Sequence, residues 1–376
     1  MREWPMLIGG FALWLTCLAF QASAQQDDHA KPAEAVYQNI QVLKGVKADI
    51  VIPTMVFIRS SLGVECNFCH VSQPKWSPEL DQKDQKKTAR KMILMMRQIN
   101  QQNFDGETWV TCATCHQGHS RPVKTPPLME APRISEAERE VAKPDEHLPE
   151  ANSIFAKYEE AIGGESAIAK LNSRVQKATG ITASGKTFEE ELYQSAPDKM
   201  LSRTIQDGTE ETYGYDGAHG WVKNKWGVWD LTSADSGIAE IKVSANFWRN
   251  LKLAPQYENT SVDGKTRISG RDTYVVRGQL NGGLFSDVLY FDTDSGLLLR
   301  RLTLEHTALG DMPRQADFSD YREVHGVKVP FAVRNADPDS LLTKTYSDVE
   351  FNIPVPSKTF AKPPKETART GSGGQN

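Results

Sequence analysis

One short cysteine frame occurs twice in this sequence, and it constrains the chain more than any other feature. The two C-x-x-C-H frames consist of Cys66, Cys69 and His70, and of Cys112, Cys115 and His116. Two thiols one turn apart can add to the two vinyl groups of a haem as thioethers, and the adjacent histidine then supplies an imidazole ligand to the iron. The repeat therefore predicts two covalently bound haem c groups.

Two other kinds of site use similar cysteine pairs. A thioredoxin-like dithiol would need neither the histidine nor its repetition. A zinc site would fit the number of cysteines, but it would not explain why histidine follows each pair directly. Haem attachment accounts for both the thiols and the histidines.

The N-terminus predicts a targeting segment. Arg2 precedes an apolar run over residues 6–20, and Ala22-Ser23-Ala24 has the small side chains of a signal-peptidase site. A transmembrane anchor is the alternative, but the run is shorter than the ~20 residues that a span needs. We expect a signal peptide over residues 1–24, cleavage after Ala24 and a periplasmic location. Cys17, the fifth cysteine, would leave with it, so none would remain for a disulfide.

Composition indicates a soluble chain with more than one domain. The chain has 376 residues, 39% of them hydrophobic, and a net charge of −4, which gives no reason to expect a nucleic-acid partner. We expect a dihaem domain over 25–125 and a proline-rich linker over 126–152 with one short helix at 135–142. An antiparallel β domain over 153–362 and a disordered tail over 363–376 follow. The predicted fold class is α+β multidomain, with the helical cytochrome domain first.

The second axial ligand decides what each iron can do. An iron held by histidine and methionine has no free position, so it transfers electrons and does not activate substrates. Met55 lies in a predicted helix over 53–63 that begins at a proline and ends at a glycine. Met92 belongs to a predicted helix over 82–100, on a stripe with Met95, Met96 and Ile99. Spacing alone leaves open which methionine is a ligand and which is core.

The stretch 37–120 resembles the cytochrome subunit of the photosynthetic reaction centre. The residues that carry the resemblance are Ser61-Leu62-Gly63 before Cys66, then Ala89-Arg90-Lys91-Met92, and Cys115-His116-Gln117-Gly118. In that family each haem unit is a helix with an axial methionine, a turn and then C-x-x-C-H. The resemblance implies that Met55 and His70 ligate the first iron, and that Met92 and His116 ligate the second.

The chain also departs from that family. Full-length members carry four haems in two such pairs, whereas this chain has one pair. No histidine lies between Asn100 and Cys112, where some members have an extra ligand, and no convincing lipid-anchor cysteine is present. The resemblance therefore implies electron transfer, and it implies neither photosynthesis nor a reaction-centre partner.

The region after Ser153 reads as short strands separated by turns. A helix over 154–162 comes first, and hairpins are expected at 287–305 and at 321–333. Tyr215-Asp216-Gly217, Gly220-Trp221 and a closing strand over 349–360 resemble the open β-barrel of outer-membrane lipoprotein carriers. That resemblance implies a cavity for a lipid or a quinone-like ligand, whereas a scaffold or docking role is the alternative.

The aromatic residues of this region are expected to fill the core of the sheet; they are Tyr213, Tyr215, Trp221, Trp226, Trp229, Phe247 and Trp248. The histidines outside the two frames show no metal-ligand spacing and are expected to be structural or surface residues; they are His29, His119, His147, His219, His306 and His325. No catalytic motif is recognisable here.

The leading functional hypothesis is a dihaem electron carrier that is not an enzyme. It would exchange electrons with a donor and an acceptor protein, either of which could be membrane-associated. Two alternatives stay open. One is a dihaem peroxidase or reductase with one open iron, and the other is a hydrophobic-ligand carrier whose haems act as a redox input.

Overall fold

The computed structural model describes residues 31–123, 147–231 and 237–364. The predicted signal peptide, the helix over 135–142, most of the linker and nearly all of the tail lie outside these ranges. The helical unit, residues 31–123, contains α1 (Ala33–Val36), α2 (Ala48–Leu62), the 3-10 turn η2 (Cys66–Phe68), α3 (Asp84–Asn103) and α4 (Cys112–His116). None of the described helices is long and apolar enough to cross a membrane.

The β domain begins with two helices and continues mainly as strands. Its elements are α5 (Ala151–Ala161), α6 (Glu165–Ile168), β1 (Ser173–Thr182), β2 (Thr187–Ser195), β3 (Lys199–Gln206), β4 (Thr209–Tyr215), β5 (Gly220–Asn224), β6 (Gly227–Leu231), α7 (Gly237–Ala245), η4 (Ala254–Gln256), β7 (Tyr257–Ile268), β8 (Arg271–Leu280), β9 (Phe285–Asp292), β10 (Leu298–Thr307), β11 (Gly310–Val324), β12 (Val327–Ala336), β13 (Leu341–Phe351) and η5 (Ser357–Phe360).

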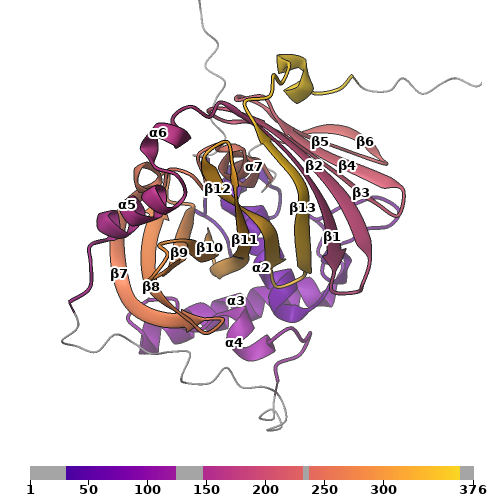
Figure 1. The fold of residues 1–376 in the computed structure, drawn as a ribbon. Coiled ribbons are helices and arrows are strands. Elements are labelled where there is room, and N and C mark those ends of the chain that lie inside the picture. Colours follow the sequence, from indigo (N-terminus) through magenta and orange to yellow (C-terminus); the bar gives the residue numbers. More distant parts are fainter. Residues whose placement is uncertain (1–30, 124–146, 232–236, 365–376) are drawn as a thin grey trace, which may run out of the picture.

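The described strands form one antiparallel sheet in the order β6-β5-β4-β3-β2-β1-β13-β12-β11-β10-β9-β8-β7. Strands that follow one another in the sequence pair with each other, except β6 and β7, which form the two edges of the sheet, and β1 pairs with β13. Figure 1 shows the sheet curving around α7, with the helical unit at one end of the strands. This architecture confirms the predicted fold class of a helical domain followed by an open antiparallel sheet.

The helix that carries Met55 begins earlier than expected. The sequence predicted a start at Pro53, but α2 starts at Ala48 and Pro53 lies inside it. Proline usually breaks a helix interior because it lacks an N–H; here Pro53 is buried, and its packing outweighs the lost hydrogen bond. The predicted stop is confirmed, since Gly63 has a left-handed φ of 61° and caps the helix.

The methionine stripe of α3 is not a single buried face. The buried residues of this helix are Ile93, Met96 and Asn100, which follow a helical period of three and four. Met92 and Met95 lie beside this face and remain 37% and 49% exposed. Of the methionines in the stripe, Met96 is therefore the one that lies in the core.

Both predicted hairpins are present, as β9–β10 and β11–β12. The closing strand was predicted over 349–360, but β13 ends at Phe351. Pro354 and Pro356 follow, and neither can donate a ladder hydrogen bond, so the chain leaves the sheet there. The expectation of aromatic core residues holds for Tyr215, Trp221 and Phe247. It is wrong for Tyr213, Trp226 and Trp229, which are exposed.

Two apolar clusters hold the helices of the β domain against the sheet. Phe155 and Tyr158 of α5 pack edge-on against Phe291 of β9, and Phe247 and Leu251 complete the same apolar cluster. A second cluster joins α7 to β3 and β4; its members are Met200, Tyr215, Ile238, Ile241 and Ala245. Burial of these side chains removes apolar surface from water and holds the curved sheet together.

Helix α7 contacts strands from both halves of the sheet. Its Ile238 packs against Gly220 of β5, where a Cβ would lie 2.8 Å from the isoleucine side chain. Its Glu240 pairs with Arg314 of β11 at 2.9 Å. Since β5 and β11 belong to opposite halves of the strand order, α7 lies within the curve of the sheet.

Candidate haem-attachment site

Each C-x-x-C-H frame forms a tight helical turn. In the first frame the N–H groups of Cys69 and His70 both donate to Cys66 O, at 3.3 and 3.0 Å. The second frame is the short helix α4, and Thr111 and Thr114 cap its start in a reciprocal capping box. Such a turn places the two thiols of a frame on one side of the chain, as thioether formation to a single haem requires.

The four cysteines in the described part of the chain form no disulfide. Cys66 and Cys115 are exposed, whereas Cys69 and Cys112 are half-buried, so one thiol of each frame is sheltered. Burial raises the pKa of the Cys69 thiol and of the Cys112 thiol. A raised pKa disfavours the reactive thiolate that a redox dithiol needs.

The two histidines have the same hydrogen-bond arrangement. His70 Nδ1 lies 3.1 Å from Pro78 O, and His116 Nδ1 lies 2.8 Å from His119 O. A carbonyl oxygen can only accept, so Nδ1 must carry the proton in each ring. The lone pair then lies on Nε2, and the carbonyl fixes the orientation of the ring, as is usual for histidines that bind metals.

The loop that orients His70 is itself held by α3. Lys86 donates to Pro78 O and Leu80 O, at 2.8 and 3.0 Å. Lys86 and Arg90 both pair with Asp81 at 2.9 Å, and these contacts hold the pKa of Asp81 well below its usual value. Desolvation lowers the pKa of His70, and the nearby cations add to this effect, so its neutral, metal-binding form is favoured.

The two predicted methionine ligands lie in different surroundings. Met55 of α2 is half-buried and packs against an apolar cluster formed by Leu43, Phe57, Ile93, Met96 and Leu309. Met92 of α3 is 37% exposed, and only its neighbour in the sequence, Ile93, belongs to that cluster. Each methionine thus belongs to the helix that precedes its predicted haem frame.

The end of α2, just before the first frame, meets the turn just after the second frame. Helices α2 and α4 are in contact, and the N–H of Gly118 donates to Ser61 O at 2.9 Å. A Cβ on Gly63 would lie only 2.1 Å from Gly118 O. This close approach fixes the position of one frame relative to the other.

The residues present fit haem c better than zinc. Among the described residues, no three His, Cys, Asp or Glu side chains come together as a metal cluster. Apolar rings stand beside the frames instead: Trp76 lies 5.7 Å from the His70 ring, and Trp109 is 68% exposed three residues before Cys112. Exposed aromatic side chains next to paired thiols and an oriented imidazole suit a large apolar porphyrin.

The β domain contains two polar clusters that the sequence did not indicate. Fully buried Asp287 accepts hydrogen bonds from Tyr257 and Thr303 and pairs with Arg249 at 2.6 Å. Paired on all sides by the protein itself, this carboxylate is structural.

The second cluster lies on the other face of β9–β11. His306 Nε2 lies 3.0 Å from Ser286 Oγ, and His306 Nδ1 lies 2.8 Å from Asp311 Oδ1. Ser286 pairs with strands on both sides, so its amide belongs to a central strand and not to an oxyanion-binding turn. Only the register of three strands brings these residues together, and no local motif could have revealed them.

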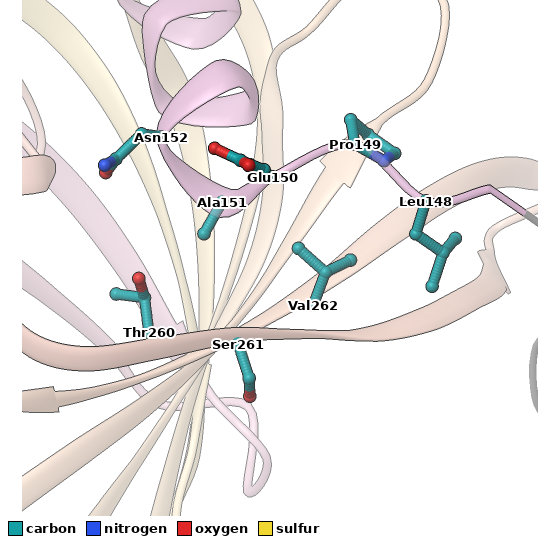
Figure 2. A pocket seen from close by; sticks show the side chains of 8 residues that line it. All are labelled: Leu148, Pro149, Glu150, Ala151, Asn152, Thr260, Ser261 and Val262. Carbon is teal, nitrogen blue, oxygen red and sulfur yellow. The ribbon is translucent and has the colours of Figure 1, made fainter.

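Figure 2 shows a shallow pocket in the β domain. It measures about 410 Å³ and lies between the start of α5 and β7. Thr260 and Val262 point toward α5, while Ser261 between them points away. The pocket contains none of the predicted haem residues, so it is separate from the candidate site.

Comparison with known proteins supports the cytochrome resemblance for the first part of the chain. Residues 16–155 match the family model of the photosynthetic reaction centre cytochrome C subunit. A reaction center cytochrome c subunit from Thermochromatium tepidum is 35% identical over 100 residues, which cover 26% of this chain and 24% of that protein. The match thus spans about a quarter of the length of the curated relative.

Solved structures resemble a larger part of the chain at low identity. A DUF1329 family protein from Desulfovibrio piger is 13% identical with a TM-score of 0.40, over 56% of this chain and 96% of its own. A LolA superfamily protein from Nitrosomonas europaea is 14% identical with a TM-score of 0.39, over 57% of this chain and 99% of its own.

Proposed function

We propose that this chain is an exported dihaem c-type cytochrome that passes electrons between two redox proteins. The observation that carries the proposal is the paired histidine geometry. In both frames Nδ1 donates to a backbone carbonyl, so Nε2 is left as the ligand atom next to two free thiols. A redox dithiol needs no oriented histidine. Zinc-binding histidines are oriented in the same way, so it is the repeated C-x-x-C-H spacing beside each oriented ring that favours haem over zinc.

Each residue of the site has a defined role in this proposal. Cys66, Cys69, Cys112 and Cys115 would hold two haems by thioether bonds. His70 and Met55 would ligate one iron, and His116 and Met92 the other. A haem c with these two ligands on its iron would exchange one electron and would have no coordination position open to a substrate.

Other residues of the chain would support electron transfer by fixing where the two haems lie. The Pro78 and His119 carbonyls keep the imidazoles oriented, and the Gly63–Gly118 contact keeps the two frames at a fixed separation. The β domain, which we propose to span 153–362 after a linker over 126–152, would anchor this unit to its partners. The signal peptide over 1–24, with cleavage after Ala24, would direct the chain to the periplasm.

The test is the visible spectrum of the full chain beside Met55→Ala and Met92→Ala. Oxidised wild type should show the weak red band of Met–iron coordination, and the reduced protein should not bind carbon monoxide. Each variant should lose about half of the band and open one iron to carbon monoxide. Met95→Ala is the matched control, because Met95 lies on the same helix and is also exposed.

Two results would contradict the proposal. If wild type already binds carbon monoxide, one iron is open and the peroxidase or reductase alternative gains support. If Met92→Ala behaves like the Met95→Ala control, Met92 is not a ligand. Covalent haem stoichiometry, measured on the same samples by intact mass, separates a lost ligand from a lost haem.

A further inference from the structure

The β domain inserts one turn into the core of the helical unit. This hairpin tip, residues 307–310, joins β10 to β11. Leu309 at its apex is 1% exposed, which makes it the most buried member of the cluster with Leu43, Phe57, Ile93 and Met96. The core that supports both methionine-bearing helices is therefore completed by a residue more than 180 positions beyond the second haem frame.

The contacts of the tip lie next to the candidate ligands. Thr54 precedes Met55, is completely buried, and accepts a hydrogen bond from the N–H of Ala308 at 3.0 Å. Ile93 follows Met92 and packs in the same cluster as Leu309. Leu309 of the β domain thus belongs to one apolar cluster with residues of both α2 and α3.

The tip also touches the second haem frame. Gly310 has a φ of 148°, and a Cβ there would lie 2.7 Å from the Phe57 ring and 3.1 Å from the Thr111 side chain. Thr111 is the residue that caps α4 directly before Cys112. Only a glycine allows the strand to come this close to both elements.

A second contact keeps the tip in place. Asp339, in the turn between β12 and β13, accepts a hydrogen bond from Ser60 Oγ at 2.8 Å and pairs with Arg59. Thr54 and Ser60 lie on the same helix, so α2 is held at two points by two neighbouring turns of the sheet.

We propose that Leu309 is a positioning residue for the methionine ligands of both haems, through which the β domain sets their coordination. This inference rests on the proposed dihaem function. Removing the Leu309 side chain leaves a cavity between α2 and α3, and the helices then lose the packing that fixes the positions of Met55 and Met92. Weaker Met–iron coordination lowers the reduction potential, because methionine ligation raises it.

The experiment compares the full chain with Leu309→Ala, Leu309→Met and Leu289→Ala. Leu289 is fully buried in the β-domain cluster, so its variant removes the same side chain away from the helical unit. The readouts are the Met–iron band, carbon monoxide binding, the midpoint potentials, the thermal midpoint and the hydrogen exchange of α3.

Leu309→Ala should keep both covalent haems but weaken the Met–iron band, bind carbon monoxide and show lower potentials and faster exchange in α3. Leu309→Met should restore the wild-type spectrum, because it refills the space. Leu289→Ala should lower the thermal midpoint without changing the spectrum. If Leu309→Ala fails to fold, Leu309→Val makes a smaller cavity and serves in the same comparison.

Two outcomes overturn the inference, and they have different consequences for the proposed function. If wild type shows the Met–iron band and Leu309→Ala changes only the thermal midpoint, as Leu289→Ala does, Leu309 is merely structural and the proposed function stands. If wild type itself lacks the band and binds carbon monoxide, the methionine ligands are wrong and both proposals fail.

Discussion

Gly63 and Gly118 are in direct backbone contact, and this contact joins the two haem frames. The φ angles of the two glycines are 61° and 81°, both left-handed. A Cβ on Gly63 would lie 2.1 Å from Gly118 O, which no packed structure tolerates. The end of the first methionine-bearing helix therefore depends on the turn that follows the second haem frame.

Gly63→Ala should destabilise the protein more than an ordinary glycine replacement. The left-handed φ alone costs about 1–2 kcal/mol for a residue with a Cβ, and the clash with a carbonyl adds to it. Gly45→Ala is the matched control, because Gly45 has a φ of 78° but open space around its Cβ position. Chemical unfolding of both variants measures the difference, and equal losses would show that the contact with Gly118 carries no energy.

Replacing both cysteines of one frame should remove one haem and leave the other. Each pair of thiols lies on its own turn, η2 or α4, so the two attachments are independent. Cys112→Ser/Cys115→Ser and Cys66→Ser/Cys69→Ser should each give a chain with a single covalent haem by intact mass. Loss of both haems from either double variant would mean that one attachment requires the other.

Thr54→Val should weaken the junction between the helical unit and the β domain. The Thr54 hydroxyl accepts from the N–H of Ala308 and donates to Ile50 O at 2.7 Å, and valine keeps the shape but can do neither. A buried amide without its acceptor costs about 1–3 kcal/mol. Thr54→Ser keeps the hydroxyl and should stay close to wild type in an unfolding titration. A loss in Thr54→Ser with none in Thr54→Val would show that the methyl group, and not the hydroxyl, holds the junction.

Asp287→Asn should change how the β domain responds to acid. Burial alone would raise the pKa of Asp287, but the charges of Arg249 and Arg301 outweigh it and hold the pKa below its usual value. The carboxylate therefore stabilises the fold above the pKa of about 3.9 that it has in the unfolded chain, and this stabilisation is lost as the pH falls below that value.

The substitution leaves two buried arginines without a carboxylate, which should cost about 3–5 kcal/mol near neutral pH. Urea unfolding of wild type and of Asp287→Asn between neutral pH and pH ~3 measures the difference between their free energies of unfolding. The gap between wild type and Asp287→Asn should narrow as the pH falls through the acid range. A constant gap at every pH would show that Asp287 is not ionised in the folded protein.

The repeated frame, the stop of α2 at Gly63 and the two β hairpins were all predictable, because each depends on residues close together in the sequence. The start of α2 was not, since the burial of Pro53 against other elements outweighs the local preference of proline. The face of α3 that is buried was also missed, because its partners come from distant segments, among them Leu43, Phe57 and Leu309.

The sequence by itself predicted which residues would bind haem, because the spacing of two thiols and a histidine is a local property of the chain. It also determined that a helical domain precedes an antiparallel sheet, through the periods of its apolar residues. Only the tertiary structure decided that the Pro78 and His119 carbonyls orient the two histidines, and that Leu309 completes the core around both methionine helices. Such contacts depend on how distant segments pack, and no single segment encodes that packing.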